Sequence, residues 1–98
     1  MGRAEGDERA MRFTYDAESD VLMIVLHPWS QVAHTVEVDD DRHVDLDGFD
    51  RVVQIEVLWA SLGVELEDII DRFDLKDFKD FLGSVAEAQP SFRPVIPA

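Results

Sequence analysis

Between residues 11 and 59, apolar and polar positions alternate with a period of two, the pattern of strands with one buried and one solvated face. Clusters rich in Asp, Gly, Ser and Pro, which favour turns, separate the alternating segments. The pattern predicts five short strands, at residues 12–15, 21–26, 32–38, 43–47 and 51–59. Because only short turns join them, we expect these strands to pair as an antiparallel meander.

After residue 61 the apolar positions recur with the spacing of α-helices. One stripe contains Leu62, Leu66, Ile69, Ile70 and Phe73, and a second stripe, out of phase with the first, contains Leu75, Phe78, Phe81, Leu82 and Val85. The stripes predict helices at residues 62–73 and 75–85, with Ser61 and Asp74 as their N-caps. The predicted fold class is α+β: an antiparallel β-meander of four to five short strands followed by two C-terminal helices.

The two ends of the chain lack this patterning. Residues 1–10 have no large apolar side chain after the first methionine, and residues 87–98 contain Pro90, Pro94 and Pro97. We expect a flexible leader at 1–10 and an extended tail at 87–98. A single domain fills residues 11–86, with the sheet at 11–61 and the helices at 62–86.

The segment VLMIVL at residues 21–26 is apolar on both faces of its strand. Two helices cover one face of a narrow sheet, so the second face needs another source of cover. A second copy of the chain is the natural source, since isologous pairs are the commonest assemblies. The sequence therefore predicts a homodimer through one face of the sheet.

The chain is strongly acidic, with 22 Asp and Glu residues against 9 Lys and Arg and a net charge of −13. This charge disfavours direct binding to nucleic acids and to anionic membranes, because both are polyanions. It permits a basic protein or a cation as partner, although solubility alone would also explain it. The chain has no cysteine, no apolar segment of membrane-spanning length and no secretory signal, so we expect a cytoplasmic protein.

Three carboxylates, Asp16, Glu18 and Asp20, lie within five residues of one turn. Hard cations such as calcium and magnesium prefer oxygen ligands of this kind. Aspartates in turns more often accept hydrogen bonds from nearby backbone groups, and we favour that interpretation. We expect no metal and no cofactor.

The remaining candidates are single residues. Glu56 lies in the middle of an apolar strand. A carboxylate there with a raised pKa would serve as a catalytic acid or base. The simpler interpretation is that Glu56 points to a solvated face or pairs with an arginine from a neighbouring strand. Trp29 lies on a proline-containing loop and is a candidate interface anchor, whereas Trp59 fits a core position equally well. His34 lies on an apolar face, which favours a hydrogen-bonded core position.

Residues 11–61 resemble the bacterial and archaeal family catalogued as domain of unknown function 2283. The matching motifs are Tyr15-Asp16-x-Glu18-x-Asp20-Val21-Leu22-x-Ile24-x-Leu26, Val44-Asp45-x-Asp47 and Val52-Val53-x-Ile55-Glu56-Val57-Leu58-x-Ala60-Ser61. The resemblance implies a short β-meander with little or no helix after it, no established activity and, weakly, a toxin–antitoxin type of pairing. It makes Tyr15, Asp16, Glu18, Asp20, Asp45, Asp47 and Glu56 candidate binding residues, beside Trp29.

Two hypotheses of different classes follow. The favoured one is a non-enzymatic interaction module, an antitoxin-like partner of a basic protein, because the chain is acidic and lacks a recognisable catalytic constellation. The alternative is a carboxylate-based metal-binding domain or small enzyme. The spatial arrangement of the motif carboxylates separates the two, since a metal or catalytic site requires them to converge in a pocket.

Overall fold

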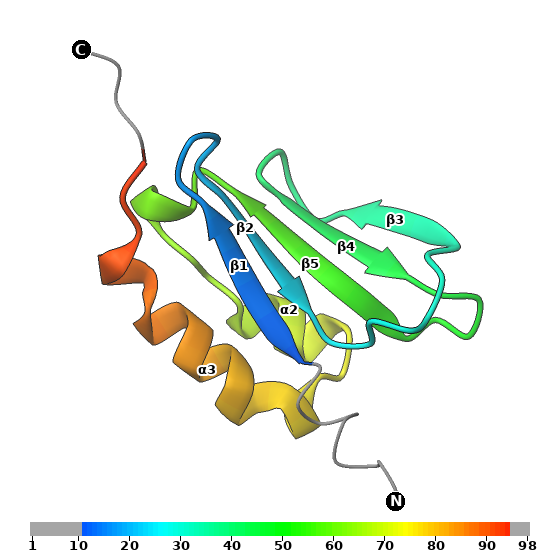
Figure 1. Ribbon diagram of the computed structural model, residues 1–98. Coiled ribbons are helices and arrows are strands. Elements are labelled where there is room, and N and C mark those ends of the chain that lie inside the picture. The colour runs from blue at the N-terminus through cyan, green and yellow to red at the C-terminus, as the bar shows by residue number, and fades with distance from the viewer. Residues whose placement is uncertain (1–10, 95–98) are drawn as a thin grey trace, which may run out of the picture.

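A computed structural model describes residues 11–94 and shows one five-stranded sheet with helices on one side (Figure 1). The strands are β1 (Arg12–Asp16), β2 (Val21–Val25), β3 (His34–Glu37), β4 (Arg42–Leu46) and β5 (Val52–Leu58). All neighbouring strands are antiparallel. The predicted α+β class with an antiparallel sheet is therefore confirmed. The expected leader at residues 1–10 lies outside the described residues.

The strand order is β1-β2-β5-β4-β3, so the meander is interrupted once. Strands β3, β4 and β5 follow one another, but β2 pairs with β5 and the loop after β2 leads to the far edge of the sheet. This order places β2 between two neighbours. A strand that is apolar on both faces buries more apolar surface in such a position, because a neighbouring strand lies on each side of it.

The helices are shorter than the periodicity predicts. They are α2 (Glu67–Arg72) and α3 (Lys79–Glu87), and 3₁₀ turns lie at Ala60–Leu62, Lys76–Phe78 and Gln89–Ser91. The predicted N-caps are wrong, because the N-cap positions are occupied by Leu66 and Phe78 without a side-chain cap. Ser61 instead hydrogen-bonds to Asp20, and Asp74 adopts a left-handed conformation with φ of 55°.

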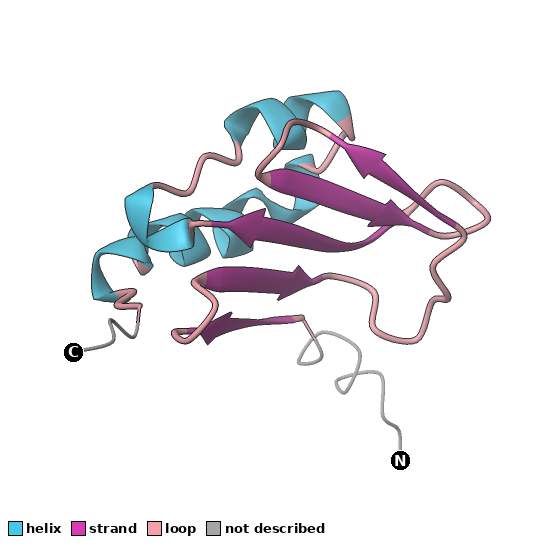
Figure 2. Cartoon of the chain, turned by 90° about the horizontal axis from the view of Figure 1, so that it is seen from above, coloured by secondary structure: helices cyan, strands magenta, loops and turns pink. Residues whose placement is uncertain are grey.

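The helical side of the sheet carries the core. Figure 2 shows both helices on the same side of the strands. Leu22, Ile24 and Ile55 from the sheet are fully buried against Ile69 of α2 and Leu82 of α3 within one apolar cluster. Burial of this face is the main stabilisation that a sheet of this size can obtain.

The described part of the tail, up to residue 94, packs against the sheet. The expected extended conformation begins later than residue 87, since α3 includes Glu87 and residues 89–91 form a 3₁₀ turn. Phe92 is buried, and its ring stacks on Tyr15 with 4.5 Å between centroids. The tail therefore contributes to the core through one aromatic side chain.

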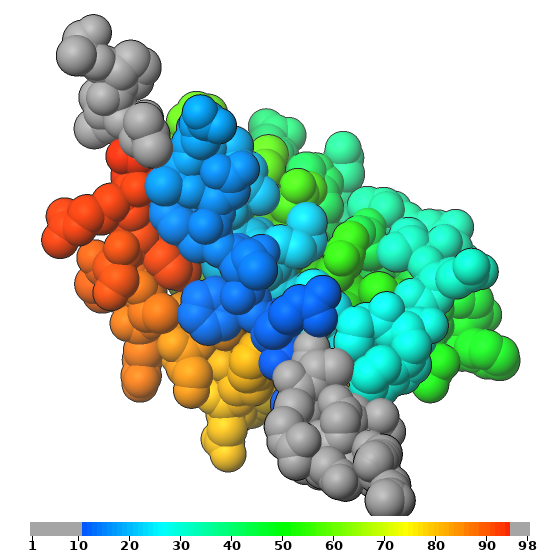
Figure 3. Space-filling view, in the orientation of Figure 1, coloured from blue at the N-terminus to red at the C-terminus, as the bar shows by residue number. Residues whose placement is uncertain are grey.

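The opposite side of the sheet, which we call the open face, carries no helix. It faces the viewer in Figure 3, where the described C-terminal segment, drawn in orange and red, lies beside it and not over it. Val21, Met23 and Val25 of β2 and Leu58 of β5 are half-buried there. Among the described residues, no helix is long and apolar enough to cross a membrane.

Candidate functional site

Asp20 is buried beneath the β1–β2 turn and has three hydrogen-bond donors around it. It accepts hydrogen bonds from the Tyr15 hydroxyl at 2.6 Å, from the Ser61 backbone N–H at 2.9 Å and from the Ser61 hydroxyl at 2.7 Å. Gln89 in turn donates to the Ser61 carbonyl. This cluster ties the first hairpin to the end of β5 and to the C-terminal segment. All of these hydrogen bonds join residues of the chain to one another, so the cluster stabilises the fold.

The cluster shifts two pKa values. Burial alone would raise the pKa of Asp20, but the hydrogen bonds from Tyr15 and Ser61 outweigh burial and hold it below its usual value. Burial and the adjacent Asp20 carboxylate raise the pKa of Tyr15 to about 12. Tyr15 thus stays protonated and donates its hydroxyl hydrogen.

Asp47 is buried in the β4–β5 turn, at the other end of β5. Its carboxylate accepts hydrogen bonds from the backbone N–H groups of Phe49 and Arg51 and from the Arg51 side chain. Burial opposes ionisation, yet these bonds lower the pKa of Asp47 to about 2. The carboxylate thus fixes the turn.

Asp45 and Glu56 lie on the open face in adjacent cross-strand rows. Asp45 accepts hydrogen bonds from Thr35 and Gln54, its neighbours on β3 and β5. Glu56 faces a ring nitrogen of His43 at 3.4 Å. Each carboxylate therefore already has partners within the surface of the sheet.

The motif carboxylates thus occupy separate places in the fold. Asp16 and Glu18 are exposed in the β1–β2 turn, where Asp16 accepts a hydrogen bond from the Glu18 backbone. Asp20 lies beneath that turn, Asp47 lies at the opposite turn, and Asp45 and Glu56 lie on the open face. Within residues 11–94, no group of three His, Cys, Asp or Glu side chains could hold a metal ion.

We expect millimolar calcium or magnesium to leave the melting temperature unchanged to within about one degree. The carboxylates of the β1–β2 turn are spread between solvent and an internal network, so they offer no shared site. A site with a dissociation constant one hundredth of the cation concentration would add about 2.7 kcal/mol to the free energy of unfolding. Thermal melts with and without 5 mM of either cation, against an EDTA control, would reveal such a gain and with it a site we have missed.

A groove of about 970 Å³ lies between α2 and α3. Its floor contains Leu66, Ile70 and Leu82, and the α3 wall contains the small residues Gly83, Ser84 and Ala86. Gly83 lies inside the helix, and a side-chain carbon added there would meet no atom within 4 Å. No contact within the described chain requires glycine at this position.

The rim of this groove is acidic. Lys79 is the one basic residue in its lining, which also contains six carboxylates: Glu65, Glu67, Asp68, Asp71, Asp80 and Glu87. Of these six residues, Asp68 forms an ion pair with Arg42. Within residues 11–94, the other five form no ion pair, and Lys79 offsets only part of their charge. The groove therefore concentrates negative potential over an apolar floor.

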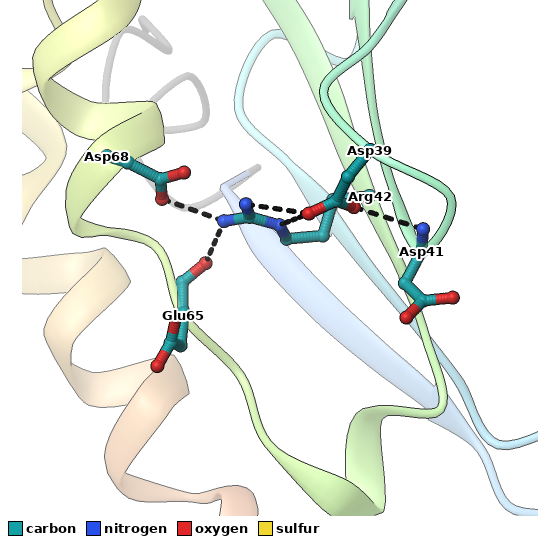
Figure 4. Close-up of polar contacts among 5 residues, drawn as sticks. All are labelled: Asp39, Asp41, Arg42, Glu65 and Asp68. Carbon is teal, nitrogen blue, oxygen red and sulfur yellow. Dashed lines mark hydrogen bonds and ion pairs between the residues drawn. The ribbon is translucent and has the colours of Figure 1, made fainter.

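Arg42 links the sheet to this region (Figure 4). Its guanidinium donates to the Asp39 carboxylate, to the Asp68 carboxylate at 2.7 Å and to the Glu65 carbonyl at 2.9 Å. Hydrogen bonds from Arg42 lower the pKa values of Asp39 and Asp68, and those carboxylates raise the pKa of Arg42. The arginine fixes the start of α2 against the β3–β4 turn.

The exposed large apolar residues gather in two places. Trp29, Val32 and Phe49 line a hollow of about 460 Å³ near the β4–β5 turn, while Trp59 and Leu62 line one of about 350 Å³ after β5. Trp29 is exposed, as an interface anchor would be, and Trp59 is exposed and not in the core. His34 is also exposed, 3.7 Å from Asp50, so its expected core position is wrong.

Sequence reasoning did not find the groove, the Arg42 links or the bond between Ser61 and Asp20. The acidic residues between the apolar positions of the first predicted helix can be read from the sequence. The groove beside them forms only because α2 and α3 pack together. Arg42 and Asp68 are 26 residues apart, so no local pattern joins them.

A family model described as "Protein of unknown function (DUF2283)" matches residues 12–61, about half of the chain. The match covers β1 to β5 and ends at Ser61, within the 3₁₀ turn Ala60–Leu62 and before α2. No curated protein and no solved structure matches the chain. The chain belongs to the DUF2283 family of proteins of unknown function.

Proposed function

We propose that this protein is a non-enzymatic interaction module that binds a basic partner in the groove between α2 and α3. The acidic rim over an apolar floor carries the proposal, because such a groove matches an amphipathic segment with cationic and apolar faces. Electrostatic complementarity of this kind gives specificity and fast association. An antitoxin-like pairing with a basic protein, which the family resemblance suggests, would be one instance of this function.

Gly83 supports the proposal. A glycine in a helix interior costs about 0.5–1 kcal/mol relative to alanine. Space is open around Gly83, so packing within the described residues does not repay that cost. Close approach of a partner's backbone to α3 would explain why the small residue stands there.

The test uses an 18-residue amphipathic peptide of leucine and lysine. We expect it to bind at low salt and to lose affinity as ionic strength rises, because screening weakens the charge attraction. Asp71→Lys on the groove rim should weaken binding about tenfold. Glu18→Lys makes the same charge change in the exposed β1–β2 turn and is expected to change affinity less than about twofold.

A second variant separates binding from folding. Gly83→Leu places a large side chain in the groove, where a better helix former should maintain or raise the melting temperature. We expect it to weaken peptide binding about tenfold or more while the fold is kept. Isothermal titration and thermal melts measure the two effects, and unaltered affinity in both Gly83→Leu and Asp71→Lys would refute the groove as the binding site.

We also propose that two copies pair through the β1–β2 half of the open face. Val21, Met23 and Val25 form an apolar row there, whereas the β3–β4 half carries Glu37 and Asp45. Apolar burial favours pairing on the first half, and repulsion between like carboxylates opposes it on the second.

Sedimentation equilibrium tests the pairing. We expect a mass of about 22 kDa, twice the 11.2 kDa of the chain, at tens of micromolar. Added salt should strengthen this dimer, because it screens repulsion between two acidic chains, while it weakens binding of a basic peptide. A mass near 11.2 kDa at both low and high salt would rule the dimer out.

A further inference from the structure

A second hollow, of about 350 Å³, lies where the end of β5 meets the segment leading to α2. Trp59 and Leu62 line it and are 58% and 82% exposed. Trp59 has φ of 56°, which ends the strand and turns the residue away from the core positions that Val53, Ile55 and Val57 occupy. Two large apolar side chains thus stand in solvent on one concave surface.

The polar lining of this hollow is acidic. The acidic residues Asp39, Asp41 and Glu65 line it, together with one basic residue, Arg42. Arg42 is already compensated, because Asp39 and Asp68 both form ion pairs with it. Within residues 11–94, the side chains of Asp41 and Glu65 have no ion-pair partner. The hollow therefore combines an aromatic ring, an aliphatic side chain and uncompensated negative charge.

We infer that this hollow binds a lysine or arginine side chain of the same basic partner that lies in the α2–α3 groove. The inference rests on the proposed function and adds a specificity subsite to it. A long basic side chain packs its aliphatic stem on apolar surface and keeps its cation near carboxylates. An indole ring adds a cation–π contact to that arrangement.

Position supports one partner for both sites. Glu65 lines both the hollow and the groove, so the two surfaces meet at that residue. Trp59 and Leu62 are the exposed apolar residues of the hollow. The other exposed tryptophan, Trp29, lines a different hollow together with Phe49. A segment that leaves the groove at Glu65 would enter the hollow that Trp59 lines.

The two tryptophans make the inference measurable. The Trp29→Phe variant keeps Trp59 as its sole tryptophan, and the Trp59→Phe variant keeps Trp29. On saturation with the leucine–lysine peptide, we expect Trp59 emission to shift to shorter wavelength and to become less accessible to iodide quenching. Trp29 emission should stay unchanged. The same peptide with lysines replaced by glutamines should leave both unchanged.

Leu62 and Phe49 provide a matched pair of substitutions, since each is 82% exposed. We expect Leu62→Ser to weaken peptide binding about tenfold and Phe49→Ser to change it less than twofold, with melting temperatures close to that of the parent chain. Circular dichroism confirms that each variant is folded before its affinity is measured.

The outcomes separate this inference from the proposed function. If Trp59 emission does not change and Leu62→Ser binds with full affinity, while Asp71→Lys still binds about tenfold more weakly, the subsite is overturned and the groove is kept. Equal responses from both tryptophans would mean that the peptide coats the acidic surface, which also overturns the subsite. No binding by the parent chain would refute both.

Discussion

Asp20→Ala is expected to lower the free energy of unfolding by about 3–5 kcal/mol. The substitution removes a buried carboxylate that accepts three hydrogen bonds and leaves the Tyr15 hydroxyl and the Ser61 N–H without their acceptor. Asp20 also has φ of 59°, a conformation that aspartate tolerates better than alanine. Urea denaturation measures the loss.

Asp16→Ala is the matched control, since it alters an exposed carboxylate of the same turn that bonds only to the adjacent Glu18 backbone. We expect it to cost less than about 1 kcal/mol. Equal losses in the two variants would show that the turn, and not the buried network, supplies the stability.

The pH dependence of the Asp20 contribution has a definite sign. The pKa of Asp20 is lower in the folded chain than the usual value of an aspartate, about 3.9, so the unfolded chain binds the proton more tightly. The stabilisation is fully present above about pH 4 and is lost as pH falls through the folded pKa. In Asp20→Asn, which keeps the shape but not the charge, the stability gap to the parent chain should narrow below pH 4.

The alternation of apolar residues predicted the sheet well because it reports burial directly. Leu22, Ile24, Ile55 and Val57 are all buried on the helical side, as a period of two requires. The pattern fails at Trp59, where a left-handed backbone ends the strand one residue before the pattern does. Backbone conformation at a single residue has no periodic signature, so the alternation could not reveal it.

The strand order and the helix starts depend on contacts between distant residues. An apolar strand such as β2 belongs inside a sheet, but the sequence does not say which strand lies beside it; here it is β5. Ser61 is a good N-cap by residue type, yet its hydroxyl bonds to Asp20, 41 residues away, and the first α-helical residue is Glu67. Tertiary partners thus overrode a local preference.

Tyr15, Asp20 and Asp47 are polar anchors of the fold, while their role as binding residues stays a prediction. For the β1–β2 turn the sequence favoured hydrogen bonds to nearby backbone groups, and Asp16 accepts one from Glu18, but Asp20 accepts its backbone hydrogen bond from the distant Ser61. The groove is formed by positions on α2 and α3 whose side chains look like ordinary solvated helix surface in the sequence. Only the packing of the two helices creates a concave surface from them.

A chain that ends at Ser61, the end of the family match, is expected not to fold as a monomer. Leu22, Ile24, Val44, Ile55 and Val57 are at most 2% exposed, and their shared core cluster includes Leu66, Ile69, Ile70, Leu75, Leu82, Val85 and Phe92 from beyond that point. Without this cover, five large side chains would face water.

Burial of each such side chain is worth about 1.5–3 kcal/mol, so the five together contribute an amount comparable with the whole stability of a small domain. We therefore expect the 1–61 chain to show no cooperative urea transition, while a chain ending at Pro94, which keeps every described residue, unfolds like the parent. If the 1–61 chain instead unfolds cooperatively at a midpoint that rises with protein concentration, a second copy has replaced the helices as the cover. A cooperative transition that does not depend on concentration would mean that the family segment is stable by itself and that the helices are not needed for it to fold.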